Sequence, residues 1–160
     1  MRTGLLICAL LLLSACGFQL QTNAQLPPQA DRVHIEIADP YSEFTRRLTT
    51  LLEQNGVQIV PAAEAHAVLK VPVNTVIKDI ASIGDSARVR EFRLTHRVRF
   101  SLSTAQGELL VPEQNLRLSR VISFDENDIL AVTREEEYLR SELADTLARQ
   151  VLRRLSTESV

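Results

Sequence analysis

The sequence predicts an α+β fold, a two-layer sandwich in which two helices pack on one face of a roughly four-stranded, mixed or antiparallel sheet. Two observations predict it. Several stretches alternate apolar and polar residues, which is typical of strands with one buried face. Two other stretches repeat apolar residues at helical spacing, so each helix has one apolar stripe. Helices and a sheet with one apolar side each bury those sides against one another.

The first fifteen residues predict a signal peptide. The apolar run from Leu5 to Leu13 is too short for a membrane span, which needs about 20 residues. Leu13-Ser14-Ala15-Cys16 resembles the bacterial lipobox, in which the cysteine is lipidated and the chain is cut before it. Cys16 is therefore the expected lipid attachment site, and Gly17 behind it favours export to the outer membrane. The alternative is an ordinary cleaved signal with an incidental cysteine.

The mature chain from Cys16 to Val160 is long enough for one domain with a core and too short for two. Removal of Arg2 leaves 17 basic and 20 acidic residues, a net charge of −3 that does not suit nucleic-acid binding. Lipidation would consume the thiol of Cys16, the only mature cysteine, so no disulfide is expected. Few aromatic residues and no tryptophan argue against a stacking site for sugars or bases.

Residues 16–31 predict a lipidated tether and residues 32–160 the single domain. The tether has little charge and contains the Pro27-Pro28 pair. Residues 32–37 alternate as a half-buried strand. Asp39-Pro40 predicts a helix N-cap, and Asn55-Gly56 predicts the end of that helix. The buried face of the helix is expected to hold Tyr41, Phe44, Leu48, Leu51 and Leu52, and the apolar GVQIV that follows continues a βαβ-type unit.

Long strands follow from Ala67. The pattern predicts that Leu69 shares a face with Val71, Val73, Thr75 and Ile77, opposite Lys70, Asn74 and Lys78. Pro72 lacks an amide donor, which suggests an edge strand or a bulge. Residues 82–87 predict a turn, and a second turn is expected near Gln106-Gly107. The next strand is expected to bury Phe92, Leu94, His96, Val98, Phe100 and Leu102, and the last one Leu116, Leu118, Ile122 and Phe124.

The last element is predicted to be a helix that starts at Thr133. Thr133 and Glu136 have the spacing of a capping box. Acidic residues then occupy the first turn and arginines the last, as the helix dipole favours. The buried stripe is expected to contain Leu139, Leu143, Ala144, Leu147, Ala148, Val151, Leu152 and Leu155.

The strand alternation leaves one sheet face basic and uncovered, with Arg93, Arg97, Arg99 and Arg117 on it. Such a face is often simply solvated. Like charges about 7 Å apart are mildly unfavourable, however, unless an anion or an acidic partner lies over them. Arg88 and Arg90 extend the basic area to the end of the sheet, and arginine forks bind phosphates well.

No pattern of catalysis or metal binding is present in the sequence. The three histidines are far apart, and nucleophile elbows and phosphate-binding loops are absent. His96 is expected to be a hydrogen-bonded core residue. Asp125-Glu126-Asn127-Asp128 invites a calcium interpretation, but Ile129 and the missing glycine favour a solvated loop or a helix approach. No cofactor and no metal are expected.

Four segments together resemble one family. They are CGFQL at the lipobox, RVHIEIADPYSEFTRRLTTLLEQNGVQIV, DIASIGDSARVREFRLTHRVRFSL, and REEEYLRSELADTLARQVLRRL. In this order they look like the LPS-assembly lipoprotein E family, LptE (formerly RlpB), from the lipobox to Leu155. The sequence departs from the family in lacking an arginine directly after Leu20 and in ending soon after the last helix.

The resemblance implies a non-enzymatic outer-membrane lipoprotein that plugs the β-barrel LptD, assists its assembly and binds lipopolysaccharide. It ascribes ligand contacts to basic residues near sheet-end loops, which makes Arg88, Arg90 and Arg134 the lipopolysaccharide-binding candidates. Arg93, Arg97, Arg99 and Arg117 are the candidates for docking to the barrel. The alternatives are an auxiliary periplasmic lipoprotein of a lipid-transport ABC system and, less favoured, a lipid-anchored hydrolase.

Overall fold

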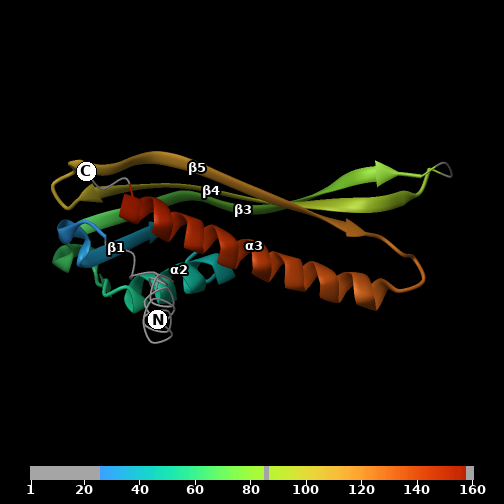
Figure 1. The fold of residues 1–160 in the computed structure, drawn as a ribbon, viewed down its shortest axis with the longest axis horizontal. Coiled ribbons are helices and arrows are strands. Elements are labelled where there is room, and N and C mark those ends of the chain that lie inside the picture. Colours follow the sequence, from blue (N-terminus) through green and yellow to red (C-terminus); the bar gives the residue numbers. More distant parts are fainter. Residues whose placement is uncertain (1–25, 85–86, 158–160) are drawn as a thin grey trace, which may run out of the picture.

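The computed structural model describes residues 26–84 and 87–157 (Figure 1). The predicted signal peptide, Cys16 and Asp85 in the predicted turn lie outside the described residues. No helix in the described ranges combines the length and the apolarity that a membrane crossing requires.

The sheet has five strands in the order β2-β1-β3-β4-β5, which confirms the α+β class. β1 is parallel to β2 and β3, whereas β3, β4 and β5 are antiparallel neighbours. The fifth strand is the two-residue β2 within GVQIV, so the expected count of four was one short. The strand bounds are β1 Arg32–Ile37, β2 Gln58–Ile59, β3 Ala67–Ile83, β4 Val89–Thr104 and β5 Leu109–Ser123.

The first long helix, α2, spans Glu43–Gln54 and is capped by Ser42, whose side chain accepts a hydrogen bond from the Thr45 amide at 3.2 Å. The prediction of Asp39 as the N-cap was therefore wrong. The Asp39 carbonyl instead accepts hydrogen bonds from the Ser42 and Thr45 hydroxyls. Tyr41 consequently precedes the helix and is 85% exposed, not buried. The predicted end is confirmed, with Asn55 as the C-cap and Gly56 at a φ of 87°.

The last helix, α3, spans Ile129–Thr157 and begins four residues before the predicted start at Thr133. The Asp128 carboxylate accepts from the Ala131 amide at 3.1 Å and so occupies the capping position. The Thr133 hydroxyl donates to the Ile129 carbonyl within the helix, and Glu136 accepts from Lys78 of β3 and from Arg140 one turn further along α3. The capping-box prediction was wrong because an acceptor further upstream already satisfies the helix start.

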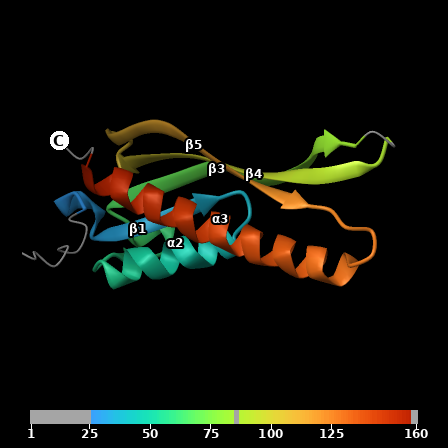
Figure 2. The same ribbon diagram turned by 45° about the vertical axis from the view of Figure 1, so that its right-hand side comes forward.

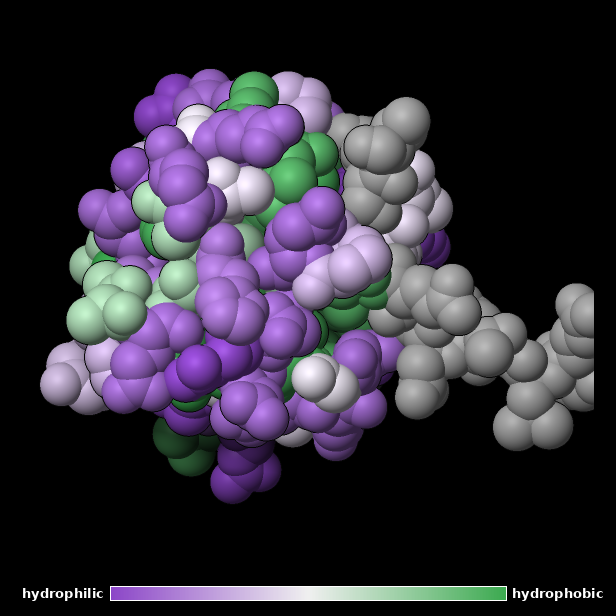
Figure 3. All heavy atoms as spheres, turned by 90° about the vertical axis from the view of Figure 1, so that its left-hand side faces the viewer, coloured by the Kyte–Doolittle hydropathy of each residue, from purple (hydrophilic) through white to green (hydrophobic). Residues whose placement is uncertain are grey.

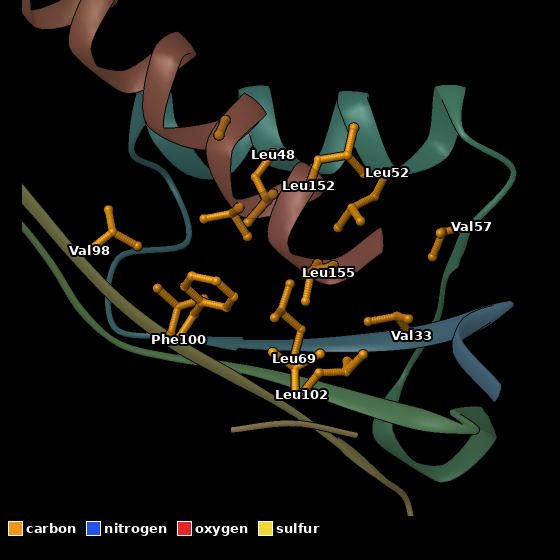
Figure 4. Packing of buried hydrophobic residues seen from close by; sticks show 14 of the residues in the cluster. Val33, Leu48, Leu52, Val57, Leu69, Val98, Phe100, Leu102, Leu152 and Leu155 are labelled. Carbon is orange, nitrogen blue, oxygen red and sulfur yellow. The ribbon is translucent and has the colours of Figure 1, made fainter. Parts of the chain in front are cut away.

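Both helices cover the same face of the sheet, as predicted (Figures 1 and 2). Figure 4 shows Leu48 and Leu52 of α2 and Leu152 and Leu155 of α3 above Leu69, Phe100 and Leu102 of the strands. The stripe predicted for α3 is buried from Leu143 onward, with Leu139 partly exposed. A smaller cluster under the first half of α3 contains Leu94, Ile122, Val132 and Leu143. Leu26 and Ala30 also pack on the main core, so packing begins before Arg32.

Pro72 lies at a bulge in β3 that reverses the side-chain alternation. The register of β3 against β4 shifts between Lys70 and Val73, and an extra residue in a strand turns every later side chain to the opposite face. Asn74 and Lys78 therefore face the helices, while Thr75 faces outward with Val73 and Ile77. The face assignment beyond Pro72 was wrong for this reason. β3 is also a central strand, which leaves the bulge as the correct alternative.

Candidate docking and lipid-binding surfaces

The arginine face is defined here as Arg93, Arg97 and Arg99 of β4 together with Arg117 of β5. The structure brings all four to the side of the sheet that the helices leave open, because their neighbours Leu94, Val98 and Phe100 are buried on the other side. Arg93, Arg97 and Arg117 are exposed and Arg99 is half-buried. The predicted alternation of β4 is confirmed.

Arg97 and Arg117 lie directly opposite each other on adjacent strands. The Phe124 amide donates to the Arg90 carbonyl at 2.8 Å, and the register is regular from there to the Arg99 position. Hydrogen-bonded and non-hydrogen-bonded pairs alternate along an antiparallel ladder, and Arg90 with Phe124 is a hydrogen-bonded pair. Arg97 and Arg117 therefore form a non-hydrogen-bonded pair, in which the two Cα atoms lie about 4.5 Å apart. No carboxylate of the described residues lies within 4.0 Å of either guanidinium.

Acidic residues balance the charge at the two ends of the arginine face but not at its centre. Glu113 lies 3.6 Å from Arg99, and Asp79 is the cross-strand neighbour of Arg93. Between them a shallow hollow is lined by Val73, Val98, Asn115 and Leu116 and by three arginines of the face, Arg97, Arg99 and Arg117. The centre is thus an open basic depression that can accept a carboxylate or another anion.

The hairpin end is defined as the end of the molecule with the β3–β4 turn and the start of α3. Arg88 and Arg90 flank the turn, and Arg134 is exposed on the second turn of α3. Arg88 is paired with Glu126 at 3.0 Å, which ties the turn to the β5–α3 loop. The Arg90 side chain passes close over Gly84, where a Cβ atom would lie 2.4 Å from Nε. These three residues share one end of the molecule, but Arg88 already has an internal partner.

Exposed apolar side chains at the hairpin end were missed by the sequence analysis. Ile80 and Ile83 end β3, Val121 lies near the end of β5, and Ile129 and Leu130 begin α3. They are between 48% and 73% exposed. The exposure of these side chains could not be predicted from the sequence, because it depends on the bulge at Pro72 and on the true start of α3, which determine which residues face solvent.

Ion pairs between the sheet and α3 also escaped prediction. Glu136 accepts from Lys78 at 2.5 Å and from Arg140 at 2.7 Å. Burial works to raise the pKa of the Glu136 carboxyl, but the hydrogen bonds from Lys78 and Arg140 outweigh it and hold that pKa below its usual value. The Arg120 guanidinium donates twice to Glu142, at 2.6 and 3.0 Å. These contacts hold the first half of α3 against the part of the sheet beyond β1, where β3, β4 and β5 continue.

His96 is a core histidine, as predicted. It is 2% exposed, its Nε2 lies 2.8 Å from the Asn74 Oδ1, and Phe44 packs edge-on against its ring at 5.7 Å. In the acidic loop, Asp125 accepts from Asn127 and Asp128 caps α3. Within the described ranges no three histidine, cysteine, aspartate or glutamate side chains are grouped to hold a metal ion.

Residues 30–155 match the sequence model of the LptE family, described as lipopolysaccharide-assembly. The chain belongs to the LptE family. This family is assigned to lipopolysaccharide assembly, and its curated members are named LPS-assembly lipoproteins.

Two curated LptE relatives illustrate the similarity. The LPS-assembly lipoprotein LptE of Yersinia enterocolitica is 29% identical over 158 residues, covering 94% of this chain and 73% of the relative. That of Photorhabdus laumondii is 29% identical over 156 residues, covering 97% and 85%. Both alignments extend over the segments that carry the arginine face and the hairpin end.

Solved structures with the same architecture extend the likeness to the fold. Lipoprotein B from Nitrosomonas europaea superposes with a TM-score of 0.73 at 29% identity, covering 88% of this chain and 90% of that one. The rare lipoprotein B from Shewanella oneidensis gives a TM-score of 0.64 at 26% identity, covering 76% and 90%. This chain therefore shares its fold with these two lipoproteins, and in this chain the arginine face lies on the side of the sheet that the helices leave uncovered.

Proposed function

We propose that this protein is an outer-membrane lipoprotein, anchored through Cys16 on the periplasmic side, that binds lipopolysaccharide, plugs the LptD β-barrel and assists its assembly. The observation that carries the proposal is an arginine face left uncovered by the protein's own helices in a chain of the LptE family.

Docking to the barrel is assigned to the arginine face. Like charges placed directly opposite each other destabilise a sheet, so Arg97 beside Arg117 is a cost to the free domain. An acidic residue on the barrel wall would remove that cost. The face is also broad and shallow, which suits a protein wall better than a small ligand.

Lipopolysaccharide binding is assigned to the hairpin end through Arg88, Arg90 and Arg134. Arginine forks match phosphate groups, which lipid A carries. The exposed Ile83, Ile129 and Leu130 supply apolar surface at the same end. Basic and apolar groups side by side fit an amphipathic lipid. No catalytic step is assigned to either surface.

The docking proposal is tested by Arg97→Glu. The new carboxylate lies opposite Arg117, so the isolated domain should gain up to about 1 kcal/mol of stability. Recovery of the barrel in a mild-detergent pull-down, with the partner identified by mass, should nevertheless fall. Arg46→Glu, the same change on α2, is the control and should leave recovery unchanged. Full recovery with Arg97→Glu would contradict docking through this face.

The lipid-binding proposal is tested by Arg88→Glu combined with Arg90→Glu. Binding to purified lipopolysaccharide should weaken, and the binding of the unchanged protein should weaken as salt is raised. Arg93→Glu combined with Arg97→Glu serves here as the control, with an equal change of charge at a different surface. Circular dichroism checks that the double variant is folded. Unchanged binding in the double variant would indicate that Arg88 and Arg90 are ordinary solvated surface residues without a role in lipopolysaccharide binding.

A further inference from the structure

The outer edge of β5 is a long strand edge that the described part of the chain leaves unpaired. β5 is the last strand in the sheet order, and Figure 1 draws it at the margin with β4 on its inner side. The opposite margin ends in the two-residue β2, which offers little to pair with. An edge of unpaired amides and carbonyls is a template for another strand.

The backbone groups that point outward from β5 can be named. The Phe124 amide donates inward to Arg90, and pairing continues without a register shift from Glu91 with Ser123 to Phe100 with Gln114. Successive residues in a strand point their amides and carbonyls to alternate sides. The outward groups therefore belong to Asn115, Arg117, Ser119, Val121 and Ser123. Of these, the Ser119 carbonyl accepts a hydrogen bond from Arg120 Nη1 at 3.1 Å.

Protection against strand addition is confined to the first part of β5. Pro112 and the register shifts near Val111 interrupt the edge there, and both are devices that block pairing. From Gln114 to Ser123 the strand has no proline, glycine or bulge. This regular stretch is an edge suited to receive a partner.

Charge indicates which partner fits. The outward residues carry their side chains on the open face, so a strand added there places a side chain beside Arg117, with Arg97 on the other side. An acidic side chain at that position would face the uncompensated centre of the arginine face. A second copy of this chain would instead bring further arginines to the same face.

We infer that an extended, acidic segment of the barrel partner adds to β5 as a sixth strand, opposite Asn115–Ser123. The inference rests on the proposed function for the identity of the partner. It differs from docking by side chains alone, because the main chain of β5 makes the contact.

A proline substitution at one outward-facing position of β5 tests the inference. Val121→Pro removes an outward amide and leaves the β4–β5 ladder intact, whereas Val121→Thr keeps the amide at the same exposed site. In the full lipidated chain, Val121→Pro should reduce recovery of the barrel at least about tenfold, and Val121→Thr should not. Full recovery with a folded Val121→Pro overturns the inference. If the wild-type chain recovers no barrel, the proposed function fails as well, so the two failures are distinguishable.

Amide hydrogen exchange resolved to single residues tests the inference without a substitution. In the free protein the amides of Asn115, Arg117, Ser119 and Val121 should exchange fast, while Leu116 and Leu118 are already protected. In the purified complex the outward four should slow at least about tenfold. Unchanged exchange at those four overturns the inference even if Val121→Pro cannot fold. A free chain that is dimeric by light scattering and protects these amides also overturns it, in favour of a second copy.

Discussion

At the scale of single residues, His96 is a neutral histidine in a polar network within the core. Its Nε2 donates to Asn74 Oδ1, and the Asn74 amide donates in turn to Ser42, the cap of α2. The buried Nδ1 has no hydrogen-bond partner among the described residues. Burial, with a smaller contribution from the charge of Arg140, lowers the pKa of His96 from 6.5 to about 4. Protonation of His96 therefore opposes folding.

The stability of the domain should accordingly depend on His96 between pH 6.5 and about 4. In this window the unfolded chain binds the proton and the folded chain does not, so stability is full above it and falls as pH falls through it. The shift corresponds to roughly 3 kcal/mol at most. Urea unfolding at several pH values measures the slope. His96→Gln cannot titrate and should make the slope shallower, leaving the part contributed by carboxylates such as Glu136, and equal slopes in both proteins would contradict the assignment.

Residue patterns in the sequence predicted the buried His96 and the outward arginines of β4, because that strand alternates without interruption. The same patterns misplaced Asn74 and Lys78. A bulge adds one residue without changing the composition of the strand, and only the pairing with β4 reveals which side each later residue faces.

At the scale of elements, the buried apolar residues of α3 are concentrated from Leu143 onward, while ion pairs hold the turns before it to the sheet. Leu143 is fully buried between the helix and the strands, whereas Leu130 on the first turn is 73% exposed. Leu143→Asp should unfold the domain, since an unpaired buried carboxylate costs several kcal/mol and a small domain has about 5–15 in total.

Leu130→Asp is the matched control on the same helix and should change stability by less than about 0.5 kcal/mol. Thermal unfolding followed by circular dichroism compares the two variants. A Leu143→Asp protein that melts with the wild type would mean that this helix face is not buried.

The helix stripes were predictable because apolar spacing is set by burial, whereas the helix starts were not. Both Asp39 and Thr133 are good caps in isolation. Ser42 and Asp128 are the caps instead, because the loops after β1 and β5 place their side chains next to free amides in the first turns of α2 and α3. Cap choice thus depends on where the preceding strand ends.

At the scale of the whole molecule, the proposed anchor and the folded domain are separable. Cys16→Ala should abolish lipidation and release the chain from the membrane fraction, while the domain still folds because its described core begins at Leu26. Cys8→Ala, within the predicted signal peptide, is the control and should leave lipidation unchanged. Mass spectrometry of the mature N-terminus measures it. An acylated Cys16→Ala chain would contradict the lipobox interpretation.

The length of the sheet sets the reach of the protein. β1 begins and α3 ends at one end of the molecule, which Figure 3 shows as largely hydrophilic, and the β3–β4 turn lies at the other. A strand of 16 residues such as β4 extends about 50 Å, more than the roughly 30 Å thickness of a bilayer's hydrocarbon core. If the protein stands upright inside the barrel as proposed, a body of this length would reach from the leaflet that holds the proposed anchor to the level of the opposite leaflet.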